Sequence, residues 1–159
     1  MNRSKVSLVI IAVLLSTFVI GGWFILNRQS QISKEGFGIY LLENNQLVIS
    51  DKDIMSYNKN SHEIKLTEEG VEKIKALKVP VSGRPFVVKL NGEEIYNGSF
   101  WSPISSIPYS GIVIDTLIIQ NNTITIEKGY PTSEFFEGID PRNHSEIFDY
   151  FQKVGKLIQ

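Results

Sequence analysis

The sequence predicts an α+β fold: a mixed or antiparallel sheet of about six strands with helices packed on one face, preceded by one N-terminal transmembrane helix. Residues 6–26 carry no charged side chain. Short segments rich in β-branched and aromatic residues follow, separated by Asn and Gly turns, and later segments repeat apolar residues at helical spacing. The 159 residues are therefore expected to form an anchor (1–27), a tether (28–36) and one domain (37–159).

The apolar stretch has the length of a membrane-spanning helix. At about 1.5 Å per residue, residues 6–26 span about 31 Å as a helix, close to the hydrocarbon thickness of a bilayer. The alternative is a cleaved signal peptide, whose apolar core is usually about 7–15 residues and ends at small residues, whereas Trp23 and Phe24 follow here. The short tail with Arg3 and Lys5 favours a cytoplasmic N-terminus. We therefore expect a single-pass protein of the cell membrane, with its C-terminal domain outside.

The charge of the remaining chain argues against a nucleic-acid partner. Two of the 16 basic residues, Arg3 and Lys5, precede the anchor, so 14 basic residues stand against 17 acidic ones beyond it. Nucleic-acid binders carry a basic face, and the sequence gives no sign of one. The chain contains no cysteine, which excludes disulfides, thiol catalysis and thiolate metal ligands.

Strands are expected wherever a short apolar run lies between turn residues. The clearest turn is Asn91-Gly92, because both residues tolerate the positive φ angles of a type I′ hairpin. The second is Asn121-Asn122, and the segment 101–111, with its prolines and serines, is expected to be an irregular loop. The expected strands cover residues 37–42, 46–49, 62–66, 85–90, 93–100, 112–119 and 123–127.

Three segments are expected to be helical. Ser50 can cap a short helix over residues 50–57, and Thr67 can cap a second helix that ends before Pro80. Asn143 or Ser145 can cap the last helix. Its apolar residues recur at helical spacing and are expected to face the core: Ile147, Phe148, Phe151, Val154 and Ile158.

Part of the domain resembles a known family. Residues 66–74 (LTEEGVEKI), Gly83-Arg84 and residues 86–96 (FVVKLNGEEIY) are similar to the head of the first large extracytoplasmic domain of SecD, a component of the protein-export machinery. The resemblance covers residues 47–115, less than half of the chain. It implies a similar fold for this part and contact with polypeptides outside the membrane. It does not extend to transport, because SecD has several membrane helices and this chain has one expected span.

Familiar catalytic patterns do not occur in the sequence. His62 and His144 lie far apart, outside any zinc-binding spacing, and both are expected at the surface. No G-x-S-x-G, phosphate loop or dinucleotide fingerprint is present. The acidic pairs are explained by helix first turns or a hairpin: Asp51 and Asp53, Glu68 and Glu69, Glu93 and Glu94. We therefore expect no catalytic residue, no cofactor and no metal.

Aromatic residues beside a proline-containing loop are the candidate partner-binding residues: Tyr96, Phe100, Trp101 and Tyr109. Loops carry function when a scaffold positions them, and Trp and Tyr are favoured anchors in protein interfaces. The alternative is that these rings cover one end of the core.

These features predict a membrane-anchored extracytoplasmic binding or accessory domain that is not catalytic. Its expected partners are the lipid bilayer, through residues 6–26, and a protein or peptide. Two alternatives remain open. One is a small extracytoplasmic hydrolase with an unrecognised site, and the other is a structural subunit of a membrane complex.

Overall fold

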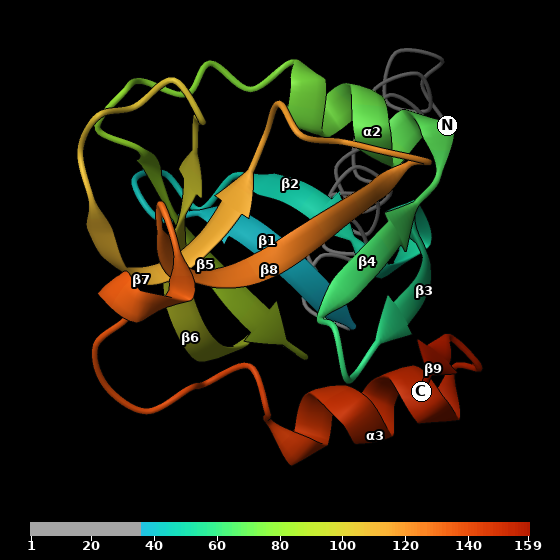
Figure 1. The fold of residues 1–159 in the computed structure, drawn as a ribbon. Coiled ribbons are helices and arrows are strands. Elements are labelled where there is room, and N and C mark those ends of the chain that lie inside the picture. The colour runs from blue at the N-terminus through green and yellow to red at the C-terminus, as the bar shows by residue number, and fades with distance from the viewer. Residues whose placement is uncertain (1–35) are drawn as a thin grey trace, which may run out of the picture. The chain divides into compact units, whose positions relative to one another are not determined.

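The computed structural model describes residues 36–159, which form one compact unit (Figure 1). The predicted anchor and nearly all of the predicted tether lie outside these residues. Within residues 36–159, no helix is long and apolar enough to cross a bilayer.

The described chain begins with a hairpin. Strands β1 (Phe37–Leu41) and β2 (Leu47–Ser50) pair in antiparallel fashion, as predicted. Asn45 in the turn has a φ angle of 57°, a left-handed conformation that asparagine adopts more readily than most residues. All five residues of β1 are buried, because this strand lies inside the sheet between β2 and β5.

The predicted helix over residues 50–57 is wrong. The chain makes one short 3-10 turn, η1 (Asp51–Asp53), and then strand β3 (Ile54–Asn58). The Asp53 carboxylate accepts hydrogen bonds from the backbone N–H of Ser50 (2.8 Å) and from its hydroxyl (2.9 Å), which closes the turn. Pairing with the next strand then favours an extended chain, in which Ile54 and Tyr57 are both buried.

Strand β4 (Glu63–Leu66) leads into helix α2 (Glu68–Lys75). The predicted N-cap is confirmed, because the Thr67 hydroxyl accepts the N–H of Gly70 at 3.1 Å. The inward-facing residues Val71 and Ile74 are buried.

Strands β5 (Arg84–Leu90) and β6 (Glu93–Trp101) form the predicted hairpin. Asn91 and Gly92 have φ angles of 52° and 87°, as a type I′ turn requires. Asn91 also holds the start of the described chain. Its side chain accepts the N–H of Gly36 (3.0 Å), and its own N–H donates to the Gly36 carbonyl (2.9 Å).

Strands β7 (Tyr109–Asp115) and β8 (Thr123–Tyr130) follow. The predicted strand over residues 112–119 is wrong at its end, because β7 stops at Asp115. The Asp115 carboxylate accepts the N–H groups of Leu117 (2.7 Å) and Ile118 (3.0 Å), a local turn that competes with the extended chain. Leu117 and Ile118 are exposed as a result.

The last elements are a 3-10 turn, η2 (Ser133–Phe135), helix α3 (Ser145–Lys153) and the short strand β9 (Leu157–Ile158). Ile147 and Phe151 are buried, as predicted. Val154 and Ile158 are exposed, contrary to prediction. The helix ends at Lys153, with Val154 as its C-cap, and Gly155 at a φ angle of 72° then turns the chain, so Ile158 no longer follows the helical spacing.

All nine strands of the described chain belong to one mixed sheet in the order β2-β1-β5-β6-β7-β8-β4-β3-β9. Two neighbouring pairs, β6–β7 and β3–β9, are parallel, and the others are antiparallel. In Figure 1 the sheet curls strongly, with α2 near the top and α3 at the bottom. Both helices bury side chains in the same core as the strands, so the domain is α+β.

Candidate functional site

The structure separates the four predicted partner-binding residues. Tyr96 and Phe100 belong to the main core inside the curled sheet. Trp101 has 2% of its surface exposed, and Tyr109 is half-buried. Tyr96, Phe100 and Trp101 are therefore not at the surface, and only Tyr109 among the four is open to solvent in part.

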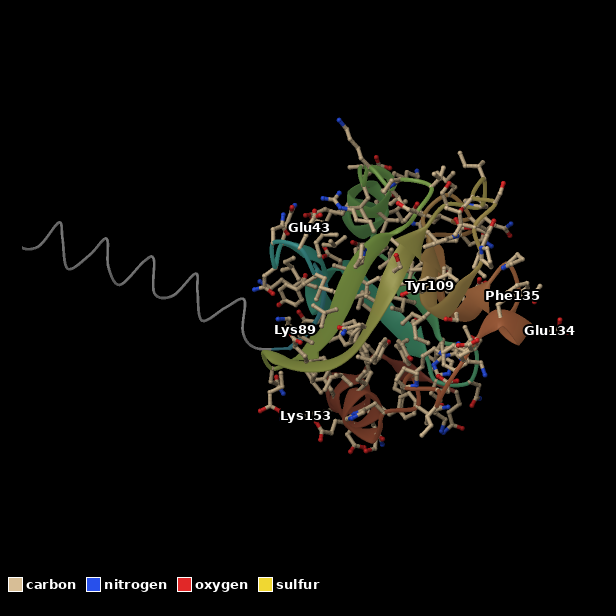
Figure 2. The ribbon with its side chains drawn as sticks, turned by 90° about the vertical axis from the view of Figure 1, so that its left-hand side faces the viewer. Glu43, Lys89, Tyr109, Glu134, Phe135 and Lys153 are labelled. Carbon is tan, nitrogen blue, oxygen red and sulfur yellow. The ribbon has the colours of Figure 1, made fainter. Side chains whose placement is uncertain are left out.

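Trp101 belongs to a second, smaller apolar cluster. Its ring stacks on that of Tyr109, with ring centres 5.0 Å apart, and lies 5.8 Å from that of Tyr130. Val87 and Val113 are also buried but lie outside the main core, which places them on the outer face of β5 and β7. Figure 2 is turned to show this side of the molecule, with Tyr109 labelled near the middle of the sheet.

The chain between β6 and β7 forms a strap, residues 102–108, over this outer cluster. Since β6 and β7 are parallel, the chain must return along the sheet between them, and Figure 1 shows it arcing around the upper left. The Tyr130 hydroxyl donates to the carbonyls of Pro103 (2.9 Å) and Ser105 (3.0 Å). The Ser105 hydroxyl donates to the carbonyl of Val81 (2.6 Å). These bonds fix the strap to β8 and to the loop before β5.

Exposed apolar side chains lie on the strap and on the loops bonded to it or to Trp101. Ile104 is 75% exposed, and Ile107 and Val81 are about half exposed. A further apolar pair follows Thr116, whose N–H and hydroxyl both donate to the Trp101 carbonyl just before the strap. We name the whole group the strap surface, and it consists of Val81, Ile104, Ile107, Leu117 and Ile118.

The four residues predicted from sequence precede or follow the strap in the chain, but three of them are buried and do not form its exposed surface. Large aromatic side chains are costly to leave exposed, so Trp101 packs beneath the strap, and Tyr96 and Phe100 pack in the main core. The isolated isoleucines among prolines and serines were the available indication of an exposed surface. Leu117 and Ile118 were missed because their apolar run is typical of a buried strand.

A polar hollow of about 410 Å³ lies on another part of the domain, along the end of β8. His62 lines it and is only 5% exposed, so the prediction that this histidine lies at the surface is wrong. Its Nδ1 atom is 2.9 Å from the Tyr57 hydroxyl. Burial lowers the pKa of His62 below its ordinary value, and the charges of Arg142 and Lys128 add to this effect against that of Asp140.

An ion-pair cluster lies beside this hollow. Arg142 donates to both oxygens of Asp140, from Nε at 2.9 Å and from Nη2 at 2.7 Å. Lys128 Nζ is 3.6 Å from the same carboxylate. Hydrogen bonds from Arg142 hold the pKa of Asp140 far below its ordinary value, so this carboxylate is charged at neutral pH.

Ser61, which lines the hollow next to His62, is bonded to a neighbouring carboxylate. The Ser61 hydroxyl, next to His62 in the chain, donates to Glu63 at 2.9 Å. Within residues 36–159, His, Asp and Glu side chains do not gather in groups of three that could hold a metal ion.

The acidic pairs have structural partners. Asp51 accepts a bond from the Tyr150 hydroxyl (2.8 Å), and Asp53 pairs with Lys73 (2.7 Å). Glu69 also contacts Lys73 (3.1 Å), and Glu94 contacts Lys89 (2.9 Å). We take the strap surface and the polar hollow as the candidate sites of residues 36–159. Comparisons of this chain with protein-family models, with curated proteins and with solved structures found no match.

Proposed function

We propose that this protein is a non-catalytic binding domain, held at the cell membrane by residues 6–26 with the folded domain outside. It contacts a protein partner through the strap surface. The observation that carries this proposal is the exposure of five apolar side chains on loops whose backbones are fixed by hydrogen bonds.

Fixed apolar loops suit binding for two reasons. Covering large apolar side chains releases about 25 cal/mol per Å² of buried apolar area, which favours a contact with another apolar surface. A loop that is already ordered loses little conformational freedom when it binds. The Tyr130 hydroxyl bonds and the Ser105–Val81 bond supply this order before any partner arrives.

Gly36, where the described chain begins, lies far from the strap. Gly36 is bonded to Asn91 at the tip of the β5–β6 hairpin, while the strap begins after Trp101 at the other end of β6. At about 3.3 Å per residue, the nine residues of β6 separate these ends by about 30 Å. A partner on the strap surface can therefore bind without disturbing the bonds between Gly36 and Asn91.

The resemblance of residues 47–115 to the SecD head supports the same proposal, although it remains a prediction. It implies contact with polypeptides outside the membrane, and the strap lies within the segment that it covers.

Site-specific photo-crosslinking in intact membranes tests the strap surface. A photoreactive amino acid at Ile104 is expected to give a discrete protein adduct. The same amino acid at Met55, which is exposed on β3 away from the strap, is the matched control. Adduct formation from position 104 should fall at least fivefold in an Ile107→Asp, Leu117→Asp variant that retains wild-type stability. Equal adducts from positions 104 and 55 would contradict the assignment.

Membrane attachment is tested separately. Full-length protein is expected to stay in the membrane pellet through alkaline carbonate extraction, and an external protease is expected to digest the domain in intact cells. Release by carbonate, or protection from the external protease, would refute the anchored arrangement without bearing on the strap surface.

A further inference from the structure

Strand β8 extends past the end of its neighbour β4. On one edge it pairs with β7 as far as Tyr130. On the other edge β4 starts only at Glu63, opposite Thr125, and the last bond between them runs from the Ile126 N–H to the His62 carbonyl at 3.0 Å. His62 has a left-handed φ angle of 56°, which turns the chain away from β8 at this point.

The register shows which backbone groups are left at this edge. Leu66 donates to the carbonyl of Asn122 (2.7 Å), and Ile126 donates to His62, so every second residue of β8 directs its N–H and C=O toward β4. Lys128 is the next residue in this series. Its main-chain N–H and C=O therefore point past the end of β4, into the polar hollow that Lys128 lines.

One side chain already acts as a substitute for the missing strand. Arg142 Nη1 donates to the Ile126 carbonyl at 2.7 Å, at the place where a paired strand would supply its N–H. Asp140 fixes this arginine through two hydrogen bonds. The open edge is thus held in shape from Ile126 onward and does not depend on a ligand for its geometry.

The hollow beside this edge is polar and nearly neutral. Its charged lining groups are Glu127, Lys128 and Arg142, and Asp140 is paired with both cations, so two positive charges are balanced by two negative ones. Its other polar side chains come from three segments: Asn60, Ser61, His62, Thr125, Thr132 and Ser133. This lining offers hydrogen bonds and no net charge, which fits an uncharged peptide better than a nucleotide or an acidic peptide.

We propose that this edge of β8 binds a short, extended, uncharged polypeptide segment, which pairs with the main chain of Lys128 and continues the sheet where β4 stops. Peptides that add to a sheet edge gain affinity from main-chain hydrogen bonds and specificity from neighbouring pockets. This site is separate from the strap surface and does not depend on it.

The test uses full-length ¹⁵N-labelled protein in detergent micelles and a blocked probe peptide, acetyl-Thr-Val-Thr-Val-Thr-amide. Titration to millimolar peptide is expected to shift the amide resonance of Lys128 together with those of Ser61 and Thr132. Two versions of the peptide, each N-methylated on one set of alternate amides, are the controls. Only the version that loses the amides facing β8 should fail to bind.

A Thr132→Trp variant tests the same site from the protein side. Thr132 is exposed and lines the hollow, so the larger ring fills the hollow while the core stays intact. Peptide affinity is expected to fall at least tenfold while the rest of the spectrum is unchanged. The proposal is overturned if the unmodified peptide shifts no resonance near Lys128, or if both N-methylated versions bind equally well. It is also overturned if the shifts appear with rising protein concentration and no peptide, since a second copy would then occupy the edge.

Discussion

Tyr57 and Tyr96 are both buried in the core, but only the Tyr57 hydroxyl has a hydrogen-bond partner among the described residues. The Tyr57 hydroxyl lies 2.9 Å from His62 Nδ1, whereas that of Tyr96 has no hydrogen-bond partner within residues 36–159. A buried polar group without a partner costs about 1–3 kcal/mol. Tyr96→Phe is therefore expected to raise the free energy of unfolding by about 1 kcal/mol, measured by urea denaturation. Tyr57→Phe should lower it by about 1–2 kcal/mol, and equal losses in both variants would contradict this assignment.

The buried His62 makes stability depend on pH. Because burial lowers its pKa in the folded state, the unfolded chain takes up a proton first as the pH falls below about 6.5. The free energy of unfolding should therefore be highest above this pH and decline as the pH falls toward the lower, folded-state value. Urea denaturation between pH 7.5 and 5.5 measures this slope.

Two variants separate the cause of the His62 effect. His62→Gln is expected to flatten the pH dependence, because the titrating group is gone. Tyr57→Phe is expected to keep it, since burial rather than the Tyr57 bond is the main cause of the lowered pKa. A wild-type slope in His62→Gln would assign the pH dependence to another group.

Among the elements, the turn η1 and helix α2 are joined by one buried carboxylate. Asp53 is buried, accepts two bonds from Ser50 and pairs with Lys73 of α2 at 2.7 Å. Burial alone would raise its pKa, but the bonds from Lys73 and Ser50 outweigh burial and lower it. The charged form therefore stabilises the fold above the ordinary pKa near 4. This contribution disappears as the pH falls through the lower, folded-state pKa.

Replacement of this carboxylate by an amide tests its role. Asp53→Asn is expected to lower the free energy of unfolding at pH 7 by about 1.5–3 kcal/mol, the usual range for hydrogen bonds to a charged group. The difference from wild type, followed by urea denaturation, should shrink as the pH approaches 3. Glu69→Gln is the control, because Glu69 contacts the same lysine from an exposed position and should cost less than about 1 kcal/mol. A constant difference at all pH values would assign the loss to packing.

The elements with local causes could be predicted from sequence. The hairpin at Asn91-Gly92 and the cap at Thr67 depend on neighbouring residues, and both are confirmed. The errors lie where a side-chain hydrogen bond determines the local backbone conformation. Asp53 closes a turn where Ser50 was expected to start a helix, and Asp115 ends a strand that its apolar composition would continue.

The candidate sites depend on contacts between distant residues, which explains why they were predicted only in part. Ile104 is exposed because Tyr130, far along the chain, holds the strap in place. The open edge at Lys128 exists because β4 begins one residue after His62, so β8 is the longer strand of the pair. This difference in length cannot be predicted from the sequence of either strand alone. Sequence patterns indicate which residues favour burial. They do not indicate which side chains stay exposed to solvent once the chain has folded.

At the scale of the whole molecule, helix α3 joins the two halves of the sheet. The Phe151 ring stacks on that of Tyr57 in β3, with ring centres 5.0 Å apart, and lies 5.0 Å from that of Phe37 in β1. These strands stand near opposite ends of the strand order, so one side chain closes the curl of the sheet. If the Phe151 ring joins both halves of the sheet into one core, removing it must lower the stability of both halves together.

Phe151→Ala is expected to lower the free energy of unfolding by about 3–5 kcal/mol, the usual cost of truncating a fully buried phenylalanine. Phe148→Ala is the matched control, since Phe148 is on the same helix, is only partly buried and lies 6.1 Å from the Tyr57 ring, so its loss should be about 1–2 kcal/mol. Urea denaturation followed by tryptophan fluorescence and by far-ultraviolet circular dichroism should give coincident single transitions in both variants. The chain's other tryptophan, Trp23, is replaced by Phe in both variants, so that fluorescence reports Trp101 in the outer cluster while circular dichroism reports the whole sheet. Two separated transitions in Phe151→Ala would show that the halves fold independently and that α3 does not unite them.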